Sequence, residues 1–217
     1  MIFEQYIPNN KTAFLAKVRE VASSLSIKPE WLMAVMFMES SLDPTEVNPD
    51  GGATGLIQFM PKTAIGLGTT TEELRRMSNV AQMDYVQRYF YPYRHKIDSF
   101  DDLYLITFYP NADGKDGELG STLTKDESWA FPPSVIRQNR KMDVNGDGRL
   151  TIADFRQWIW HKIPEEYRNI FASDLSIKIG KAIKRNAPLL LGLALLSTII
   201  AWFVYNEFSK RPDQITQ

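Results

Sequence analysis

The sequence predicts a mainly α-helical protein that ends in a single membrane-spanning helix. Apolar residues recur at helical spacing in several segments, and the alternation typical of strands is hardly seen. An uncharged apolar stretch, 187–205, is long enough to cross the hydrocarbon core of a bilayer as a helix. The 217 residues carry a formal net charge of −1, so no basic field favours nucleic acid as a partner. Without cysteine, disulfides and thiolate metal sites are excluded.

Start and stop signals place the helices along the first hundred residues. One helix is expected to run to Leu25, and a second begins at Pro29 and ends before Pro44. Polar loops rich in glycine are expected at 43–54 and 111–128. The expected N-terminal caps are Asn10, Thr70 (in a capping box with Glu73), Ser78 and Ser99.

The second of these helices carries an acid in an unusual place. Eight apolar residues run from Trp31 to Met38, so this helix is apolar on every side and is expected to be buried. Glu39 follows directly. Burial and the negative end of the helix dipole both disfavour a carboxylate, and both raise its pKa. Such a glutamate suits general acid catalysis, whereas the ordinary alternative is a helix-end glutamate that points into water.

The residues after Glu39 resemble the signature of the lytic transglycosylases with the goose-type lysozyme fold. In that family an E-S motif ends a helix, and a G-A-x-G-L-x-Q-x-M-P-x-T-A segment follows. Here the first motif is Glu39–Ser40 and the second runs from Gly52 to Ala64. The resemblance covers about residues 12–114. It implies a lysozyme-like helical catalytic domain, 1–125, whose substrate is the glycan strand of peptidoglycan.

The resemblance also implies a reaction that needs one carboxylate. Glu39 would protonate the oxygen between N-acetylmuramic acid and N-acetylglucosamine, then take the proton of the muramyl 6-hydroxyl as it attacks the anomeric carbon. The product is a 1,6-anhydro sugar. Glycoside hydrolases ordinarily use two carboxylates. A water-using muramidase with Asp43 or Asp50 as base therefore stays open, as does a non-catalytic, calcium-clipped structural protein.

Substrate-binding roles follow from the same resemblance. Gln58 lies in the segment that lines the family's cleft and is expected to bond glycan, unless it holds the loop to the Glu39 helix. Met60 lies in that segment too, with packing as the alternative to glycan contact. The family's third motif, A-Y-N-A-G, is altered to "TFYPNADG", with Pro110 in place of the asparagine. Tyr109 takes the aromatic position and is expected to contact Glu39 or the sugar, a core tyrosine being the alternative.

A second site is predicted in "DVNGDGRLTIAD", residues 143–154. It fits the EF-hand pattern D-x-[DN]-x-[DN]-G with an acid at position twelve, and its oxygen ligands favour Ca²⁺. The loop is single, which favours a dockerin-like structural clip, and an acidic turn without an ion is the alternative. It lies in a segment, 126–172, expected to pack on the catalytic domain. The expected ligands are Asp143, Asn145, Asp147, the Arg149 carbonyl, Thr151 through a water, and Asp154.

The C-terminal part predicts an anchor in a lipid bilayer. A basic linker (173–186) precedes the apolar helix, and a polar tail (206–217) follows it, with a buried core helix as the alternative. Positive charge before the span would place the preceding domain in the cytoplasm, away from peptidoglycan. We therefore expect a virion protein held in the internal membrane of a phage, with capsid or other virion proteins as partners. A bacterial envelope enzyme with a periplasmic catalytic part is the alternative.

Overall fold

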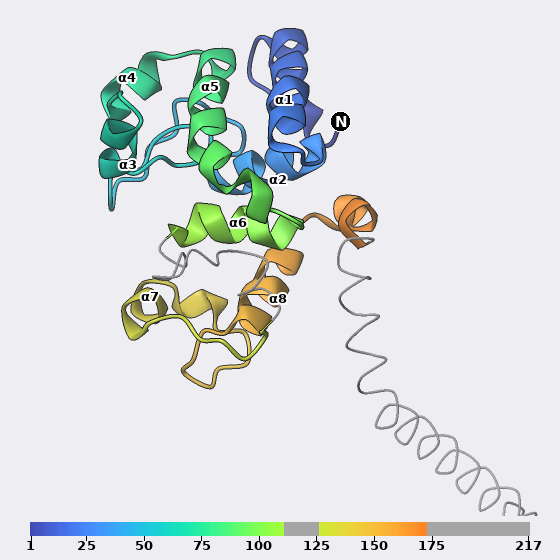
Figure 1. Cartoon of the computed structure of the whole chain (residues 1–217). Helices are drawn as coiled ribbons and strands as arrows, with labels where there is room; N and C mark the ends of the chain where they lie inside the picture. Colours follow the sequence, from blue (N-terminus) through green and yellow to red (C-terminus); the bar gives the residue numbers. More distant parts are fainter. Residues whose placement is uncertain (111–125, 173–217) are drawn as a thin grey trace, which may run out of the picture. The chain divides into compact units, whose positions relative to one another are not determined.

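The computed structural model describes residues 1–110 and 126–172, which form helices, turns and loops (Figure 1). These residues contain isolated β-bridges and no longer strand. The chain divides into two compact units, Met1–Asn169 and Ile170–Gln217, and the first is described below. The predicted linker, membrane helix and tail lie outside the described residues, as does most of the loop at 111–128. None of the described helices has the length and apolar character that crossing a membrane requires.

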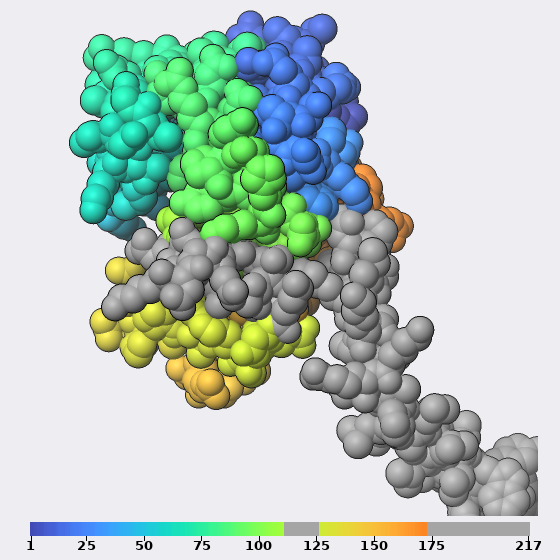
Figure 2. All heavy atoms as spheres, in the orientation of Figure 1, coloured from blue at the N-terminus to red at the C-terminus, as the bar shows by residue number. Residues whose placement is uncertain are grey.

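The buried apolar helix predicted before Glu39 is present as α2 (Pro29–Ser40). All six residues from Trp31 to Met36 are buried, which confirms that this helix is covered on every side. α1 (Lys11–Leu25) packs on α2 and on α5 (Asn79–Phe90). The short helices α3 (Pro61–Gly66) and α4 (Thr71–Arg76) contact each other, and α5 appears between them and α1 (Figures 1 and 2).

Most of the expected helix caps are confirmed. Thr70 and Glu73 form the reciprocal capping box at the start of α4. The Ser78 and Ser99 hydroxyls accept bonds from backbone N–H groups at the starts of α5 and α6 (Phe100–Phe108). The prediction that Asn10 caps α1 is wrong: Asn10 precedes the helix, but its side chain makes no capping hydrogen bond. Its backbone is left-handed, with φ at 51°, whereas a capping residue is normally extended.

The predicted calcium-loop segment forms a second group of helices within the same unit. α7 (Pro133–Gln138) and the short 3₁₀ helix η5 (Arg140–Met142) precede the loop, and α8 (Ile152–Lys162) follows it. η5 contacts both helices. The backbone of 129–131 pairs with that of 150–152, where Phe131 N–H donates to Leu150 O at 2.8 Å and Ile152 N–H donates to Trp129 O at 3.0 Å. Helices therefore lie on both sides of the loop.

Candidate active site

Glu39 lies in the last turn of α2 because the helix stops immediately after it. Ser41 and Leu42 both have left-handed backbone, with φ of 54° and 66°. Their N–H groups donate to the carbonyls of Phe37, at 2.9 Å, and Met36, at 3.3 Å, and so satisfy carbonyl oxygens at the helix end. Leu42 is fully buried, which holds this turn in place.

The surroundings of Glu39 favour its protonated form. Burial raises the pKa of its carboxyl group, and the hydrogen bond from the Tyr104 hydroxyl acts in the opposite direction. Tyr104, on α6, is 2% exposed. Burial, the Glu39 charge and this hydrogen bond raise the pKa of Tyr104 well above its ordinary value, so Tyr104 stays neutral and donates. The site pairs a protonatable acid with a fixed donor for its ionised form, which suits general acid–base work.

A second tyrosine faces the same charge from α5. Burial, the neighbouring Tyr93 and the Glu39 charge, in that order, raise the pKa of Tyr89. Its hydroxyl donates to Ile106 O at 2.8 Å, which ties α5 to α6. Two neutral tyrosines on two helices therefore surround the acid.

The loop after α2 is held beside Glu39 by two buried polar side chains. Ser40 Oγ lies 3.0 Å from the carbonyl oxygens of both Met36 and Leu56. Gln82, on α5, is fully buried. Its Oε1 accepts from Leu56 N–H at 2.9 Å, and its Nε2 donates to Pro44 O and Leu74 O at 2.6 and 2.8 Å.

Gln82 also explains a glycine of the motif. A Cβ at Gly55, where φ is 81°, would lie 2.4 Å from Gln82 Oε1, so only glycine fits. Our reading of the sequence did not single out Gln82. The sequence does carry a signal for this residue: Gln82 is a polar side chain next to Met83 on the buried face of α5, where an amide needs hydrogen-bond partners.

Gln58 and Met60 line a pocket of about 100 Å³ together with Tyr89 and Pro110. Met60 is 51% exposed, and Gln58 is half-buried. Gln58 Nε2 donates to Gly55 O at 3.2 Å and to Glu46 O at 3.4 Å, so its amide braces the loop internally, whereas the alternative expected from the sequence was a bond that holds the loop to the Glu39 helix. Glycan contact by Gln58 and Met60 stays a prediction.

Tyr109 is placed differently from Tyr104. Its ring packs edge-on against Phe131, with the ring centroids 5.6 Å apart. The tyrosine that bonds Glu39 is Tyr104, on α6, the helix that ends directly before Tyr109. A role of Tyr109 in binding sugar stays a prediction.

The acids weighed as a second catalytic carboxylate lie on the loop after α2. Asp43 Oδ1 accepts from the backbone N–H and the hydroxyl of Thr45, at 2.7 and 2.8 Å, which is a local turn. Asp50 and Glu46 are exposed. A muramidase that uses water would therefore need its base to be Asp43, which already accepts hydrogen bonds within a local turn, or an acid that is exposed to solvent.

Comparison with known proteins identifies part of this region. Residues 17–83 match the family model of the transglycosylase SLT domain. This lysozyme-like SLT domain contains Glu39, Gln58 and Met60, and it associates the chain with lytic transglycosylase activity on peptidoglycan. Tyr104 and the predicted calcium loop lie beyond the match. No curated protein and no solved structure matches the chain.

The first five positions of the predicted calcium loop form a chain of tight turns. The Asp143 carboxylate accepts from Gly146 N–H at 2.8 Å and from Gly148 N–H at 2.9 Å. Asn145 Oδ1 accepts from Asp147 N–H at 2.9 Å, and Asp147 Oδ1 accepts from Arg149 N–H at 2.8 Å. The side-chain oxygens of these three expected ligands, Asp143, Asn145 and Asp147, thus lie on one folded loop.

The last position of the loop has another partner. Asp154 is 3% exposed, and its Oδ2 accepts from the Thr151 backbone N–H at 2.9 Å and from the Thr151 hydroxyl. This is the capping box of α8. Across residues 1–110 and 126–172, no group of three or more His, Cys, Asp or Glu side chains is arranged to hold a metal. Positions one, three and five of the loop carry oxygen ligands of the type that Ca²⁺ prefers, Asp154 belongs to the capping box of α8, and calcium binding stays a prediction.

Proposed function

We propose that this protein is a lytic transglycosylase that uses Glu39 as its single catalytic carboxylate. The observation that carries this proposal is a glutamate inside the SLT match whose pKa is raised by burial and whose ionised form has a tyrosine donor. The substrate is the β-1,4 bond between N-acetylmuramic acid and N-acetylglucosamine. The product is a 1,6-anhydro end.

The proposed reaction returns Glu39 to its starting state. The protonated carboxyl gives its proton to the glycosidic oxygen as the bond from that oxygen to the anomeric carbon breaks. The muramyl 6-oxygen then bonds to the anomeric carbon, and its proton passes to the Glu39 carboxylate. Between these steps the Tyr104 hydroxyl stabilises the carboxylate through its hydrogen bond. No water and no second acid take part.

Mass spectrometry of digested peptidoglycan tests this proposal. Anhydro ends support it, whereas reducing ends point to a muramidase that uses water. Glu39→Gln should abolish release of muropeptides. The matched control is Glu20→Gln, an exposed glutamate on α1, which should digest like wild type. If the wild type releases nothing with Ca²⁺ present, a non-catalytic structural protein becomes the better description.

We also propose that residues 143–154 bind Ca²⁺ as a structural ion. Asp143, Asn145, Asp147 and the Arg149 carbonyl would hold it, with Thr151 or Asp154 completing the set through water. Bound Ca²⁺ would be coordinated by these oxygens and would thereby stiffen the loop. Calorimetric titration of the chelator-treated chain with Ca²⁺ should show one site per chain. A titration without a binding signal would contradict the proposal and favour the alternative, an acidic turn that binds no ion.

For localisation we propose that 187–205 anchors the protein in the internal membrane of a phage virion. Support comes from the uncharged length of this stretch and from the basic residues before it, which favour the cytoplasmic side during synthesis. A virion would carry such an enzyme to the wall from outside. Mass spectrometry of purified particles should find the chain. Its absence there would favour a bacterial envelope enzyme.

A further inference from the structure

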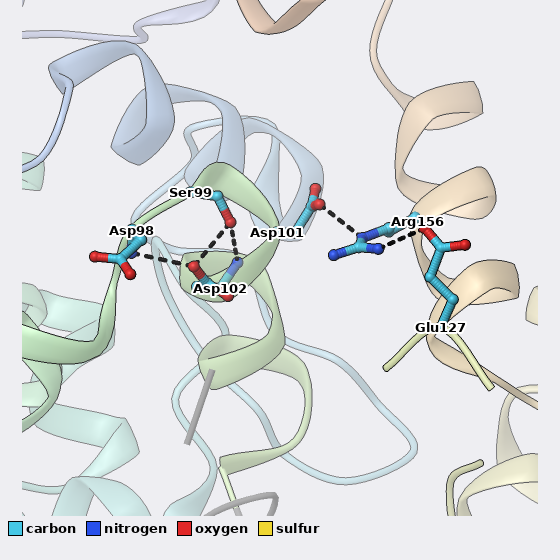
Figure 3. Close-up of polar contacts among 6 residues, drawn as sticks. All are labelled: Asp98, Ser99, Asp101, Asp102, Glu127 and Arg156. Atoms are coloured by element: carbon cyan, nitrogen blue, oxygen red, sulfur yellow. Dashed lines mark hydrogen bonds and ion pairs between the residues drawn. The ribbon is translucent and has the colours of Figure 1, made fainter. Parts of the chain in front are cut away.

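The helix that carries Tyr104 is braced from its other side by α8. Arg156 Nε donates to Asp101 Oδ2 at 3.0 Å, and its Nη1 donates to Glu127 Oε1 at 2.9 Å (Figure 3). The Arg156 and Asp101 side chains are only 10% and 6% exposed. Because so little solvent surrounds this ion pair, losing one partner would remove charge compensation that water could not easily replace, so the pair ties α8 to the start of α6.

Aromatic packing reinforces this contact at Tyr104 itself. The Tyr104 ring lies 5.9 Å from the Phe155 ring and 6.0 Å from the Trp158 ring, centroid to centroid. Both rings belong to α8, and they flank Arg156 in the sequence. The hydroxyl of Tyr104 bonds Glu39, while its ring packs on α8.

α6 depends on such contacts for its position. It has nine residues, and a helix this short is not stable without packing. Its first turn is closed locally, since the Ser99 hydroxyl donates to Asp102 Oδ2 at 2.8 Å and Asp98 N–H donates to the same oxygen at 3.1 Å (Figure 3). These bonds shape the helix, whereas its position comes from packing, on α2 directly and on the α8 side chains Phe155, Arg156 and Trp158.

We propose that Arg156 is a positioning residue, which acts through Asp101 and α6 to hold Tyr104 against Glu39. The inference deepens the proposed function and rests on it. It assigns to the segment beyond the SLT match a role in the proton chemistry of the site. The charged and titratable groups that face Glu39 are Tyr104, from α6, and Tyr89, from α5.

The test measures the Glu39 carboxyl group directly in the full chain. Carbon-13 labelling of glutamate gives its NMR titration, and the Glu39 signal is assigned as the one missing in Glu39→Gln. Arg156→Met keeps the apolar stem but removes the charge. Because Asp101 would then be a buried acid that has lost its Arg156 ion pair, the double variant Asp101→Asn, Arg156→Met is examined beside it. Arg156→Lys keeps a charge without the planar fork.

We expect the pKa of Glu39 to fall in Arg156→Met and in the double variant, because a loosened α6 admits water and burial is the larger cause of the raised value. The kcat for peptidoglycan should fall about tenfold, with KM changing less than about twofold, as expected for misplacement of a catalytic group. Arg156→Lys should lie between these variants and wild type. The control is Arg76→Met, which breaks an exposed pair with Glu72 on α4 and should change neither quantity.

The outcomes separate this inference from the proposed function. A folded double variant with the wild-type Glu39 titration overturns the positioning role, whatever the chain does to peptidoglycan. If the titration shifts as expected but the wild type releases no muropeptide, the positioning role stands and the transglycosylase proposal fails. Melting curves by circular dichroism show which variants are folded, and the double variant decides if Arg156→Met alone is not.

Discussion

Glu39 and Asp154 are carboxylates at opposite ends of two helices, and their surroundings differ. Asp154 lies in the first turn of α8, where its oxygen accepts from the N–H and the hydroxyl of Thr151. Glu39 lies in the last turn of α2, where the Tyr104 hydroxyl is its donor. The start of a helix offers unpaired N–H groups and partial positive charge, whereas its end offers carbonyl oxygens and partial negative charge.

The difference shows that burial alone does not make an acid reactive. At the start of α8 the helix supplies what a buried carboxylate needs, so Asp154 stabilises the fold. At the end of α2 burial and the helix end both oppose the charge, and burial raises the pKa of Glu39. The same functional group belongs to a capping box in one place and holds its proton more tightly than usual in the other.

The largest effect is expected from removing the proton donor. Glu39→Gln should reduce muropeptide release by about 10³-fold or more, since general acid–base groups contribute about 10² to 10⁴. Asp154→Asn should leave muropeptide release within about threefold of wild type, because Asp154 belongs to the capping box of α8 and takes no part in the proposed reaction. Equal losses in the two variants would remove the contrast between them.

The same Glu39 variant should be more stable than wild type at high pH. The folded pKa of Glu39 lies above its unfolded value, so the folded state binds the proton more tightly and ionisation lowers the free energy of unfolding. That stability is present below the unfolded pKa and is lost as pH rises through the folded pKa. Above this interval Glu39→Gln should gain about 1.4 kcal/mol for each pH unit by which the folded pKa is raised. Urea unfolding at several pH values measures it, and a constant difference across pH would contradict it.

Ca²⁺ sharpens the comparison at the other acid. If residues 143–154 bind the ion, Ca²⁺ at about 100 times its Kd should stabilise the chain by about 2.7 kcal/mol. Asp143→Asn should abolish this gain. The melting temperature with Ca²⁺ and with chelator is the measurement. A gain that survives in Asp143→Asn would show that the ion binds elsewhere.

Asp154→Ala should weaken α8 without any ion. It removes both bonds to Thr151, and the loss of a helix cap costs about 1 kcal/mol, up to about 2. Denaturant unfolding in chelator measures this loss. Asp154→Asn keeps an acceptor oxygen and should lose less. No loss in Asp154→Ala would show that the capping box contributes little.

The smallest effect is expected at Tyr104. Tyr104→Phe keeps the packing on α8 but removes the hydrogen bond that favours the Glu39 carboxylate, so the pKa of Glu39 should rise. The alkaline limb of the pH–rate profile should move to higher pH, with a loss in kcat of less than about tenfold. Tyr109→Phe is the control and should leave the limb in place. A limb that stays in place or moves to lower pH in Tyr104→Phe would contradict the role of the hydroxyl.

Local features were predictable because they are encoded within a few neighbouring residues. The bounds of α2, the capping box at Thr70 and the buried helix before Glu39 all follow from spacing and from proline or capping signals. Asn10 was the exception, since a cap depends on backbone conformation as well as residue type. The motif after Glu39 likewise pointed to the SLT family, whose match covers residues 17–83.

By itself, then, the sequence determined the helices, the burial of the apolar helix that ends at Glu39 and the direction of the pKa of Glu39. Only the tertiary structure decided which tyrosine bonds Glu39 and that Gln82 holds the motif loop. The reason is physical. Helix formation and burial depend on neighbours three or four residues away, whereas the partner of a buried polar group comes from whichever helix packs against it.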